Sequence, residues 1–579
     1  MKDLTARFVQ YLLPAYSPQH DRDVMRGMGI AIFVGVIAGL GAVLFRSLIG
    51  WIETIGFGHG KEVFSFLGKY YIILIPALGG LIVGPLIYFF AREAKGHGVP
   101  EVMIAVAKNG GRIRPRVALV KILASAITIG TGGSVGREGP IVQIGATFGS
   151  TIGQRLKLPD NWICTLVACG AAGGISATFN APIAGVFFAL EVILGSFGGR
   201  YFSVVVVSSV VSAVVSHAFF PDIANLAVPE YGLENPMAIP LFGVLGICTG
   251  IVGVCFILVL YWFEDTWDKI RLPEWFKPVV GGLIVGMLGL YSTDLFGVGY
   301  EALERAAHGE MLVAAALTLL VLKILATSIT IGSGGSGGVF APSLFLGGMT
   351  GAAFGGIANH FFPEVAGPVG AYAIVGMAST FSSTARAPVT AVVILFELTR
   401  NYDIILPLMT CVVVSMIVSQ MIYKESIYSK KMRRKGVEPP SEKSFDALES
   451  VLVRDVMTKG FKGVPGNTSL TGLEDVFKST GQRGLLVFDE KGGLEGMVTV
   501  TDVESAFLEG KADMTAADIA TRHLVTAYAD QSVREALLQI GGTEVGRIPV
   551  VSRENPREVE GVLRRHDIIA AYDRAYKKS

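Results

Sequence analysis

The chain has 579 residues, of which 51% are hydrophobic, 17% are charged and 72 are glycine, and its mean hydropathy is +0.54. Soluble globular proteins carry about a quarter charged residues, so this composition argues against a soluble enzyme. The net charge of +1 offers no electrostatic case for a nucleic-acid partner. The residues from Lys431 onward hold 45 of the 97 formal charges, which predicts a membrane body followed by a water-soluble tail.

In chain order, residues 1–27 carry seven charged side chains around short apolar pieces, and we expect an amphipathic helix on the cytoplasmic face of the membrane. Long apolar runs follow, each able to cross the roughly 30 Å hydrocarbon core as a helix. These runs are 28–51, 71–90, 201–219, 239–263, 311–331 and 404–423. The stretches 141–152, 181–194 and 341–357 are shorter and interrupted by glycine and proline, so we expect helices that end inside the protein.

An internal repeat organises the body. Residues 121–140 align without a gap on residues 323–342, with 13 of 20 positions identical. A second pair follows, in which Asn180 precedes Ala-Pro and Glu191, and Arg386 precedes Ala-Pro and Glu397. The membrane domain, 28–430, is therefore predicted to consist of two homologous halves, 28–220 and 235–430, with paired interrupted segments at a substrate site near the midplane.

The two halves are inverted if each crosses the membrane an odd number of times. Basic residues cluster directly after the last apolar run, from Lys430 to Lys435. By the positive-inside rule this places that side in the cytoplasm, together with both chain ends. We expect a multi-pass protein of the plasma (inner) membrane.

In each half a glycine-rich turn ends in proline and begins a helix, at Gly136 to Pro140 and at Gly338 to Pro342. A helix start carries unpaired N–H groups and about half a positive charge. Converging starts of this kind would bind a dehydrated anion without trapping it. Most other glycines are expected to serve close helix packing. A phosphate loop is a weak alternative, because no Gly-Lys-Ser/Thr follows these turns and no cytosolic βα unit surrounds them.

Glu138 is the most informative side chain of the body. An intramembrane carboxylate costs roughly 2.5 to 3.5 kcal/mol and usually marks a functional site. At the mouth of an amide-lined anion site, its carboxylate would occupy the place of the anion, and protonation would release it. The corresponding residue of the second half is Phe340, which cannot ionise. The alternative is a structural glutamate paired with Arg137.

These residues resemble the CLC family of chloride channels and chloride/proton antiporters. The motifs that carry the resemblance are Gly96 to Glu101, Gly136 to Pro140, Asn180 to Glu191, Gly338 to Pro342, and Tyr428. The resemblance implies an all-α polytopic fold of two inverted repeats, forming a homodimer in the lipid bilayer with one anion pathway per subunit. It also implies that Glu138 is the outer gating glutamate. The anion, chloride or another small anion, would be bound by His97, Gly98, Val99, Gly136, Arg137, Val339, Phe340 and Tyr428.

Two departures from the family pattern affect these expectations. His97 stands where much of the family has serine beside the central anion; its imidazole either donates to the anion or points away and leaves backbone amides to bind. Val192 stands where family antiporters commonly have a proton-carrying glutamate, and the adjacent Glu191 points about 100° away on a helix. This favours a passive channel, with an antiporter that uses another proton route as the runner-up.

After a linker at 431–450, two similar units follow, about 451–512 and 513–579. Gly496 precedes Asp502 by the same spacing that separates Gly561 from Asp567. This resembles a small α/β tandem of CBS domains, which implies binding of ATP, ADP or AMP. The nucleotide-contacting residues would be Thr499, Asp502, Arg564 and Asp567. A purely structural, dimerising tail is the alternative.

Two other classes of function compete with anion conduction. A different inverted-repeat transporter, for a small carboxylate, would share the helix starts but not the ordered motifs. A membrane enzyme is the weakest reading, because the body shows no nucleophile triad, metal-ligand set or paired carboxylates at helical spacing.

Overall fold

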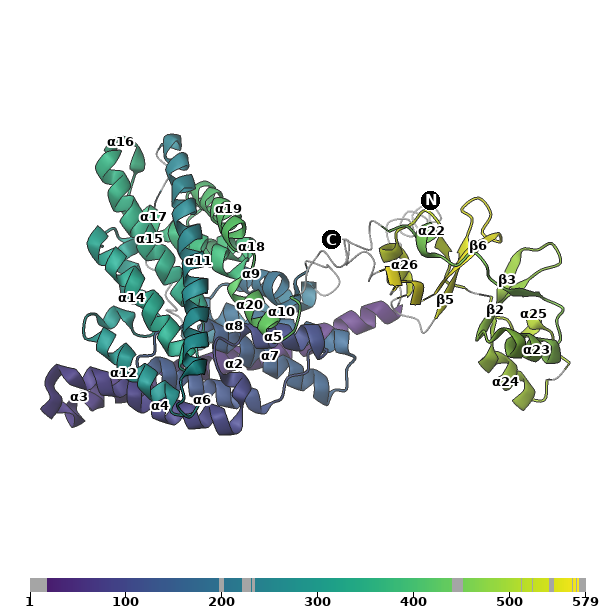
Figure 1. Ribbon diagram of the computed structural model, residues 1–579, viewed down its shortest axis with the longest axis horizontal. Helices are drawn as coiled ribbons and strands as arrows, with labels where there is room; N and C mark the ends of the chain where they lie inside the picture. The colour runs from purple at the N-terminus through teal and green to yellow at the C-terminus, as the bar shows by residue number, and fades with distance from the viewer. Residues whose placement is uncertain are drawn as a thin grey trace, which may run out of the picture. The chain divides into compact units, whose positions relative to one another are not determined.

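The computed structural model describes residues 18–196, 202–220, 231, 235–439, 451–511, 513–522, 524–540, 546–564, 566–568 and 570–571. The chain divides into two compact units, Met1–Pro440 and Ser441–Ser579, which are described separately (Figure 1). Of the predicted interfacial segment 1–27, residues 1–17 lie outside the described residues. The remainder is the first part of a long helix that continues without a break into the membrane body.

The first half of the membrane unit is helical throughout its described length. Its helices are α2 (Pro18–Glu53), η1 (Thr54–His59), α3 (Gly60–Val63), η2 (Ser65–Tyr70), α4 (Tyr71–Phe90), η3 (Arg92–Ala94), α5 (Val99–Lys108), α6 (Arg116–Gly130), α7 (Glu138–Arg155), α8 (Asp160–Phe179), α9 (Pro182–Phe188), η4 (Ala189–Leu194) and α10 (Phe202–Phe219).

The second half repeats this order. Its helices are η5 (Pro236–Ala238), α11 (Ile239–Lys269), α12 (Lys277–Gly289), η6 (Thr293–Leu295), α13 (Tyr300–Ala307), α14 (Val313–Gly332), α15 (Phe340–Phe361), α16 (Pro363–Ala366), α17 (Val369–Ala385), α18 (Pro388–Thr399), α19 (Ile405–Ile422) and α20 (Ile427–Arg434).

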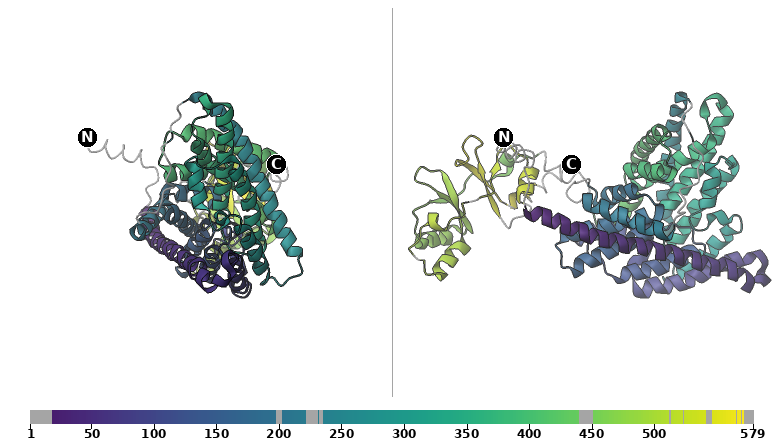
Figure 2. Two further views of the ribbon diagram at one scale, coloured as in Figure 1. Left: turned by 90° about the vertical axis from the view of Figure 1, so that its left-hand side faces the viewer. Right: turned by 180° about the vertical axis from the view of Figure 1, so that it is seen from behind.

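Equivalent helices pack in equivalent ways. Helix α7 packs on α8 in the first half as α15 packs on α17 in the second, and the mates α4 and α12 pack on each other, as do α9 and α18. The long helix α2 (purple in Figure 2) packs along α6, α7, α8 and α10. Mates that contact each other reciprocally are related by a two-fold axis, so the two halves form the predicted internal repeat, and the predicted helical fold class is confirmed.

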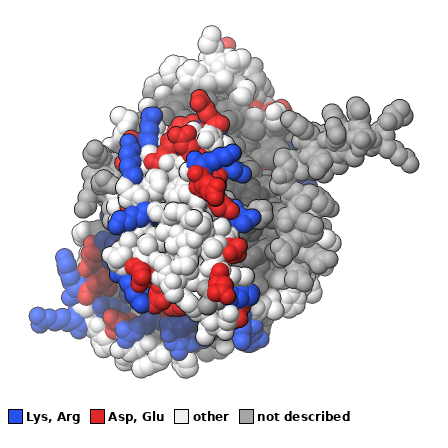
Figure 3. All heavy atoms as spheres, turned by 90° about the vertical axis from the view of Figure 1, so that its right-hand side faces the viewer, with Lys and Arg blue, Asp and Glu red and all other residues white. Residues whose placement is uncertain are grey.

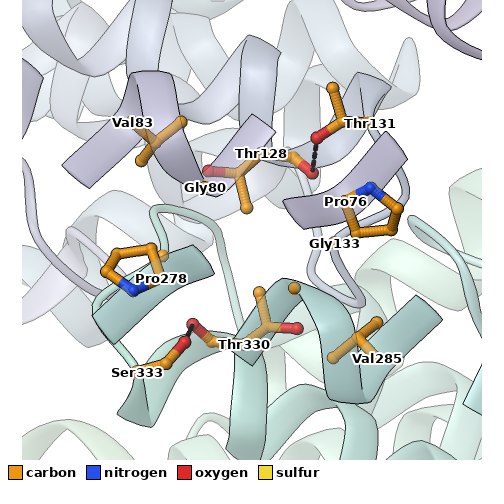
Figure 4. Close-up of a pocket in the computed structure, with 12 residues that line it drawn as sticks. Pro76, Gly80, Val83, Thr128, Thr131, Gly133, Pro278, Val285, Thr330 and Ser333 are labelled. Atoms are coloured by element: carbon orange, nitrogen blue, oxygen red, sulfur yellow. Dashed lines mark hydrogen bonds between the residues drawn. The ribbon is translucent and has the colours of Figure 1, made fainter. Parts of the chain in front are cut away.

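A small cavity of about 30 Å³ marks this axis (Figure 4). Its walls are six pairs of repeat mates. The pairs are Pro76 and Pro278, Gly80 and Gly282, Val83 and Val285, Thr128 and Thr330, Thr131 and Ser333, and Gly133 and Gly335. The threonine hydroxyls of the two halves cross the axis, because Ser134 N donates to Thr330 Oγ1 and Ser336 N donates to Thr128 Oγ1. The halves are therefore interlocked by two equivalent hydrogen bonds, one from each half to the other.

The helices that face lipid begin and end close to the predicted bounds, whereas the central ones do not. The prediction that 341–357 is too short to span is wrong: α15 has 22 residues and is long enough to cross. Helix α8 also meets the length and composition of a span and was not predicted. Both helices are rich in glycine, alanine, serine and threonine, since they are packed against other helices rather than lipid.

Each half also caps a helix of the other half with a carboxylate. The carboxylate of Glu191 accepts hydrogen bonds from the backbone N–H groups of Val389 and Thr390, at 3.1 and 2.8 Å, in the first turn of α18. It also accepts the hydroxyl of Thr390 at 2.6 Å. Glu397 does the same for two first-turn N–H groups of α9, at 3.0 and 2.7 Å. These contacts pair N–H groups that a helix start leaves without an intrahelical acceptor. The dipole of the helix also favours a negative charge at its N-terminal end.

Replacing Glu191 by alanine is expected to destabilise the membrane unit by about 2 kcal/mol, because it leaves half-buried N–H groups of α18 without their charged acceptor. Thermal unfolding of the detergent-solubilised protein measures the change. Glu310→Ala is the matched control, since Glu310 is exposed and outside any helix. Equal unfolding temperatures of the two variants would contradict the capping role.

The tail unit contains two three-stranded sheets of the same design. The first has the order β1 (Gly463–Pro465), β2 (Gly484–Phe488), β3 (Leu494–Thr499), and the second has the order β4 (Ala527–Tyr528), β5 (Arg547–Val551), β6 (Val559–Arg564). In each sheet the first pair is parallel and the second antiparallel. The helices are α22 (Val453–Val456), α23 (Leu470–Thr480), α24 (Val500–Leu508), α25 (Ala516–Ile519) and α26 (Val533–Ile540). Basic and acidic side chains are interspersed on the face drawn in Figure 3.

Candidate functional site

The two glycine-rich turns meet at the centre of the membrane unit. Gly136 N donates to Gly338 O at 2.8 Å, and Gly338 N donates to Gly136 O at 2.6 Å, so repeat mates are paired antiparallel. Because α7 and α15 begin directly after these turns, their N-terminal ends converge from the two halves. This proximity is the arrangement predicted from the repeat.

The turn before α5 joins the same place. Gly96 N donates to Gly335 O at 3.2 Å, and Gly337 N donates to Gly96 O at 3.3 Å. Gly98, the residue that precedes α5, has a φ of +83°, which favours glycine. A Cβ on Gly139 would lie 2.2 Å from the carbonyl oxygen of His97. We call this meeting of the turns before α5, α7 and α15 the junction.

The helices begin two or three residues earlier than predicted. Helix α7 begins at Glu138 and α15 at Phe340, so Pro140 and Pro342 are the third residues of their helices rather than the first. Proline is tolerated there because the first turn has no intrahelical acceptor for its missing N–H group. The consequence is that Glu138 belongs to the helix start itself.

Glu138 is 1% exposed and lies at the junction. Its Oε1 accepts the hydroxyl of Tyr300 at 3.4 Å, whereas its Oε2 has no hydrogen-bond partner among the described residues. A Cβ on Gly136 would lie 2.2 Å from Oε2 and 3.2 Å from the backbone nitrogen of Ala341. The carboxylate therefore lies over the glycine turn and beside the first turn of α15. Glycine at position 136 makes the room for it.

His97 and Tyr428 lie on the other side of the junction. Their ring centroids are 6.2 Å apart, and both side chains are buried. Neither ring nitrogen of His97 has a hydrogen-bond partner within the described part of the chain. A buried imidazole with free donor capacity is a costly arrangement that an anion would relieve.

The remaining predicted anion-binding residues are also at helix starts. Val339 precedes α15 and Phe340 is its first residue, while Val99 is the first residue of α5. The ring of Phe340 packs against Phe179 and Phe381, with centroids 5.3 and 4.2 Å apart. The side chain of Phe340 is therefore packed against aromatic rings. The N–H groups of the first turn form the polar surface at the start of α15.

Tyr428 is positioned by short helix α20, which is fixed by neighbours on several sides. The hydroxyl of Tyr261 donates to Ile427 O at 2.5 Å. Lys431 Nζ pairs with Glu264 of α11 at 2.8 Å. The basic cluster that indicated a cytoplasmic face thus also holds the tyrosine in place.

Val192 lies in η4 and is buried, and its side chain cannot carry a proton. Glu191 is engaged in capping α18, as described above, and is therefore a structural residue.

Tyr300 was not predicted from the sequence, and it is the only described side chain that donates a hydrogen bond to Glu138. A repeat signal could have found it. Gly297 and Gly299 precede Tyr300 as Gly96 and Gly98 precede Val99, and both second glycines have φ near +80°. The symmetry extends to two buried lysines, since Lys121 Nζ donates to Gly96 O at 2.7 Å and Lys323 Nζ donates to Gly297 O at 2.9 Å.

A cavity of about 490 Å³ lies next to Glu138 on the side of Tyr300. Its walls include Arg137, whose guanidinium carbon lies 5.3 Å from the centroid of the Tyr300 ring. Ile49 and Glu53, near the C-terminal end of α2, also line it. Helix α2 has 36 residues and is about 54 Å long, so the cavity lies at the opposite face of the membrane unit from the start of that helix.

In the tail, the predicted nucleotide residues form two helix-start pairs. The Thr499 N–H and hydroxyl donate to Asp502 Oδ2 at 2.7 and 2.6 Å, and Arg564 N donates to Asp567 Oδ2 at 3.1 Å. Arg564 also lines a cavity between the two sheets, but this cavity measures only about 10 Å³, which is room for a single water molecule. As it stands, this cleft is too small for a nucleotide.

Both units of the chain are similar to known protein families. A family model described as voltage gated chloride channel matches residues 79–420, and a CBS domain model matches 453–509 and 516–574. The chain is 30% identical over 561 residues to chloride channel protein CLC-f of Arabidopsis thaliana, covering 83% of this chain and 70% of that protein. It is 35% identical over 421 residues to the H(+)/Cl(-) exchange transporter ClcA of Vibrio cholerae, covering 70% and 88%.

Among solved structures, a slow cyanobacterial Cl-/H+ antiporter is similar with a TM-score of 0.65 and 27% identity, covering 71% of this chain and 98% of the other. These matches confirm the resemblance predicted from the motifs, for the membrane body and for the tail.

Proposed function

Because the chain belongs to the voltage gated chloride channel family, we propose that it conducts chloride and other halides through one pathway per subunit, gated by Glu138. Proteins of this family transport chloride; the gating residue and the mode of transport are our inference. A single observation carries it, namely the position of the Glu138 carboxylate between the converging starts of α7 and α15. An anion drawn to those N–H groups has to displace the carboxylate.

His97 and Tyr428 extend this pathway toward α20. We propose that a dehydrated anion receives hydrogen bonds from the imidazole and from the Tyr428 hydroxyl, in addition to first-turn N–H groups of α15 and α5. The free ring nitrogens of His97 support this assignment. His97→Ala distinguishes binding by the imidazole from binding by backbone groups alone. Binding by the imidazole predicts a weaker halide affinity of the variant in calorimetry, and binding by backbone groups alone predicts no change.

We propose passive conduction as the mode. Val192 carries no proton, and Glu191 is held in the cap of α18 by three hydrogen bonds. Proton-coupled exchange is the second candidate, and similarity to the exchange transporter of Vibrio cholerae and to the cyanobacterial antiporter favours it.

The two modes differ in one measurement. Chloride efflux from liposomes that contain the purified protein is recorded together with external pH. Efflux without stoichiometric proton movement supports the channel, and coupled proton uptake supports the antiporter. A complete lack of halide flux from folded protein would exclude both.

We also propose that the protein is a homodimer of the plasma (inner) membrane with both termini in the cytoplasm. The basic cluster of α20 supports this orientation. The tail would then face the cytoplasm, where adenine nucleotides are available.

For the tail we propose an adenine-nucleotide sensor. Arg547 and Arg564 lie directly opposite each other on β5 and β6, and Arg564 Nε is buried without a partner among the described residues. Like charges in such cross-strand pairs are destabilising, so a phosphate group between them would be favourable once the cleft opens. This pair favours a ligand-binding tail over a purely structural one.

Millimolar AMP or ATP is expected to raise the unfolding temperature of the full-length protein, since a ligand at ten times its Kd stabilises by about 1.4 kcal/mol. Differential scanning calorimetry measures the shift. Arg564→Ala should remove it, while Arg522→Ala, which replaces an exposed tail arginine away from the cleft, should retain it. If neither nucleotide shifts the transition of the unmodified protein, the sensor is ruled out.

A further inference from the structure

Tyr300 contacts both the outer cavity and Glu138. It lines the cavity of about 490 Å³, and its hydroxyl donates to Glu138 Oε1 at 3.4 Å. Glu138 is 1% exposed and is not among the residues that line this cavity. The Tyr300 side chain therefore lies at the boundary between the cavity and the buried carboxylate.

Backbone contacts fix the position of Tyr300 at the start of α13. Gly297 N donates to Gly133 O at 3.1 Å, so the turn before α13 is attached to the glycine-rich segment before α7. The buried Lys323 donates to Gly297 O at 2.9 Å and fixes the same turn from α14. Tyr300 and Glu138, the first residues of α13 and α7, are therefore placed beside each other by the backbone.

Arg137 contacts the face of the same aromatic ring. Its guanidinium carbon lies 5.3 Å from the centroid of the Tyr300 ring, within the range of a cation–π contact. Two consecutive residues, Arg137 and Glu138, thus contact the ring face and the hydroxyl of one side chain. Phenylalanine at position 300 would keep the aromatic face for Arg137 and remove only the hydroxyl, so the two contacts can be separated by experiment.

The other half of the repeat has no polar pair at the equivalent place. The mate of Tyr300 is Val99, which begins α5, and the mate of Glu138 is Phe340, which begins α15. Neither of these side chains can donate or accept a hydrogen bond. Apolar side chains therefore suffice for packing at these two helix starts. The hydroxyl and the carboxylate are found together only on the cavity side of the junction, which favours a role in the gate.

We propose that Tyr300 is a positioning residue of the gate, whose hydroxyl holds the Glu138 carboxylate over Gly136, in the place that the anion has to take. This inference rests on the proposed gating by Glu138 and adds the group that stabilises the closed arrangement. The distance of 3.4 Å exceeds the usual length of about 2.7 to 2.8 Å for a hydrogen bond between two oxygens. The bond is therefore weak enough for an anion to break when it displaces the carboxylate.

Currents across a planar bilayer that contains the full-length protein, recorded at a series of chloride concentrations, test this role. Tyr300→Phe is expected to lower the half-saturating chloride concentration about fivefold, which corresponds to about 1 kcal/mol, because the anion then displaces a less firmly held carboxylate. The current at saturating chloride should stay unchanged, since excess anion displaces the carboxylate with or without the hydroxyl. In a Glu138→Ala background Tyr300→Phe should have no effect, because the acceptor of the hydrogen bond is absent.

Tyr71→Phe is the matched control. Tyr71 also lines the cavity, but among the described side chains only Tyr300 donates to Glu138, so this variant should leave the half-saturating concentration unchanged. A structural role of the Tyr300 hydroxyl predicts instead that Tyr300→Phe changes the current equally with and without Glu138.

That result would overturn the proposal, and so would an unchanged or higher half-saturating concentration in Tyr300→Phe alone. If the unmodified protein conducts no halide, the proposed conduction is wrong. If it conducts but Glu138→Ala leaves the half-saturating concentration unchanged, the proposed gate is wrong.

Discussion

Replacing Glu138 by glutamine is expected to raise chloride flux about tenfold, which corresponds to about 1.4 kcal/mol of barrier removed. The carboxylate lies over Gly136 and beside the first turn of α15, and in the proposed gate it competes with the anion for the N–H groups there. A neutral amide of the same size still fits over Gly136 but competes weakly, as a protonated carboxyl would. If the unmodified protein exchanges protons, the variant should also lose that proton movement.

Chloride efflux from liposomes, followed with a chloride electrode, measures this effect. Glu101→Gln is the matched control: Glu101 is also in the first turn of a helix at the junction, but it pairs with Lys435 instead of facing the anion. Its flux should change less than about twofold. A lower flux in Glu138→Gln, with an unchanged elution profile in size-exclusion chromatography, would show that Glu138 is not the gate.

Replacing Gly145 by alanine is expected to destabilise the membrane unit by about 3 kcal/mol or more. At this crossing of α7 and α8, a Cβ on Gly145 would lie 2.1 Å from Gly170 O, and a Cβ on Gly170 would lie 2.0 Å from Gly145 O. The obstacle is backbone rather than a flexible side chain, so the helices have to separate. Since α7 begins with Glu138, the displacement should also abolish flux.

The fraction of monodisperse protein after heating, measured by size-exclusion chromatography, reports this loss. Gly243→Ala is the control, because a Cβ at that position meets nothing within 4 Å. Similar heat resistance of the two variants would mean that α7 and α8 tolerate a wider spacing than the structure indicates.

The helices whose bounds could be predicted from the sequence are those that are surrounded by lipid. The helix α4 has the predicted bounds because lipid selects a continuous apolar run. Helices α8 and α15 were missed or underestimated because 83% of their most apolar stretch is buried in protein, where small residues that permit close packing replace large apolar ones.

The same distinction applies to the site. The repeat located Glu138, and the paired turns made the meeting of the two helix starts predictable. Tyr300 was missed because the glycines before it, Gly297 and Gly299, mark a helix start but do not show what that helix contacts. Its hydroxyl reaches Glu138 only through the tertiary arrangement of α13 and α7. Glu191 was visible as a charge, but its role as a cap on a helix of the other half depends on contacts about two hundred residues apart in the chain.

The reciprocal caps of Glu191 and Glu397 have a consequence for biosynthesis. While the ribosome is still making the second half, the first half has a carboxylate without its amide partners and a helix start, α9, without its carboxylate. Each of these unmet groups carries a penalty of about 1 to 3 kcal/mol. The caps of the first half therefore form only after residues near position 397 have been made, and assembly of the membrane unit is completed only after nearly all of it has been made.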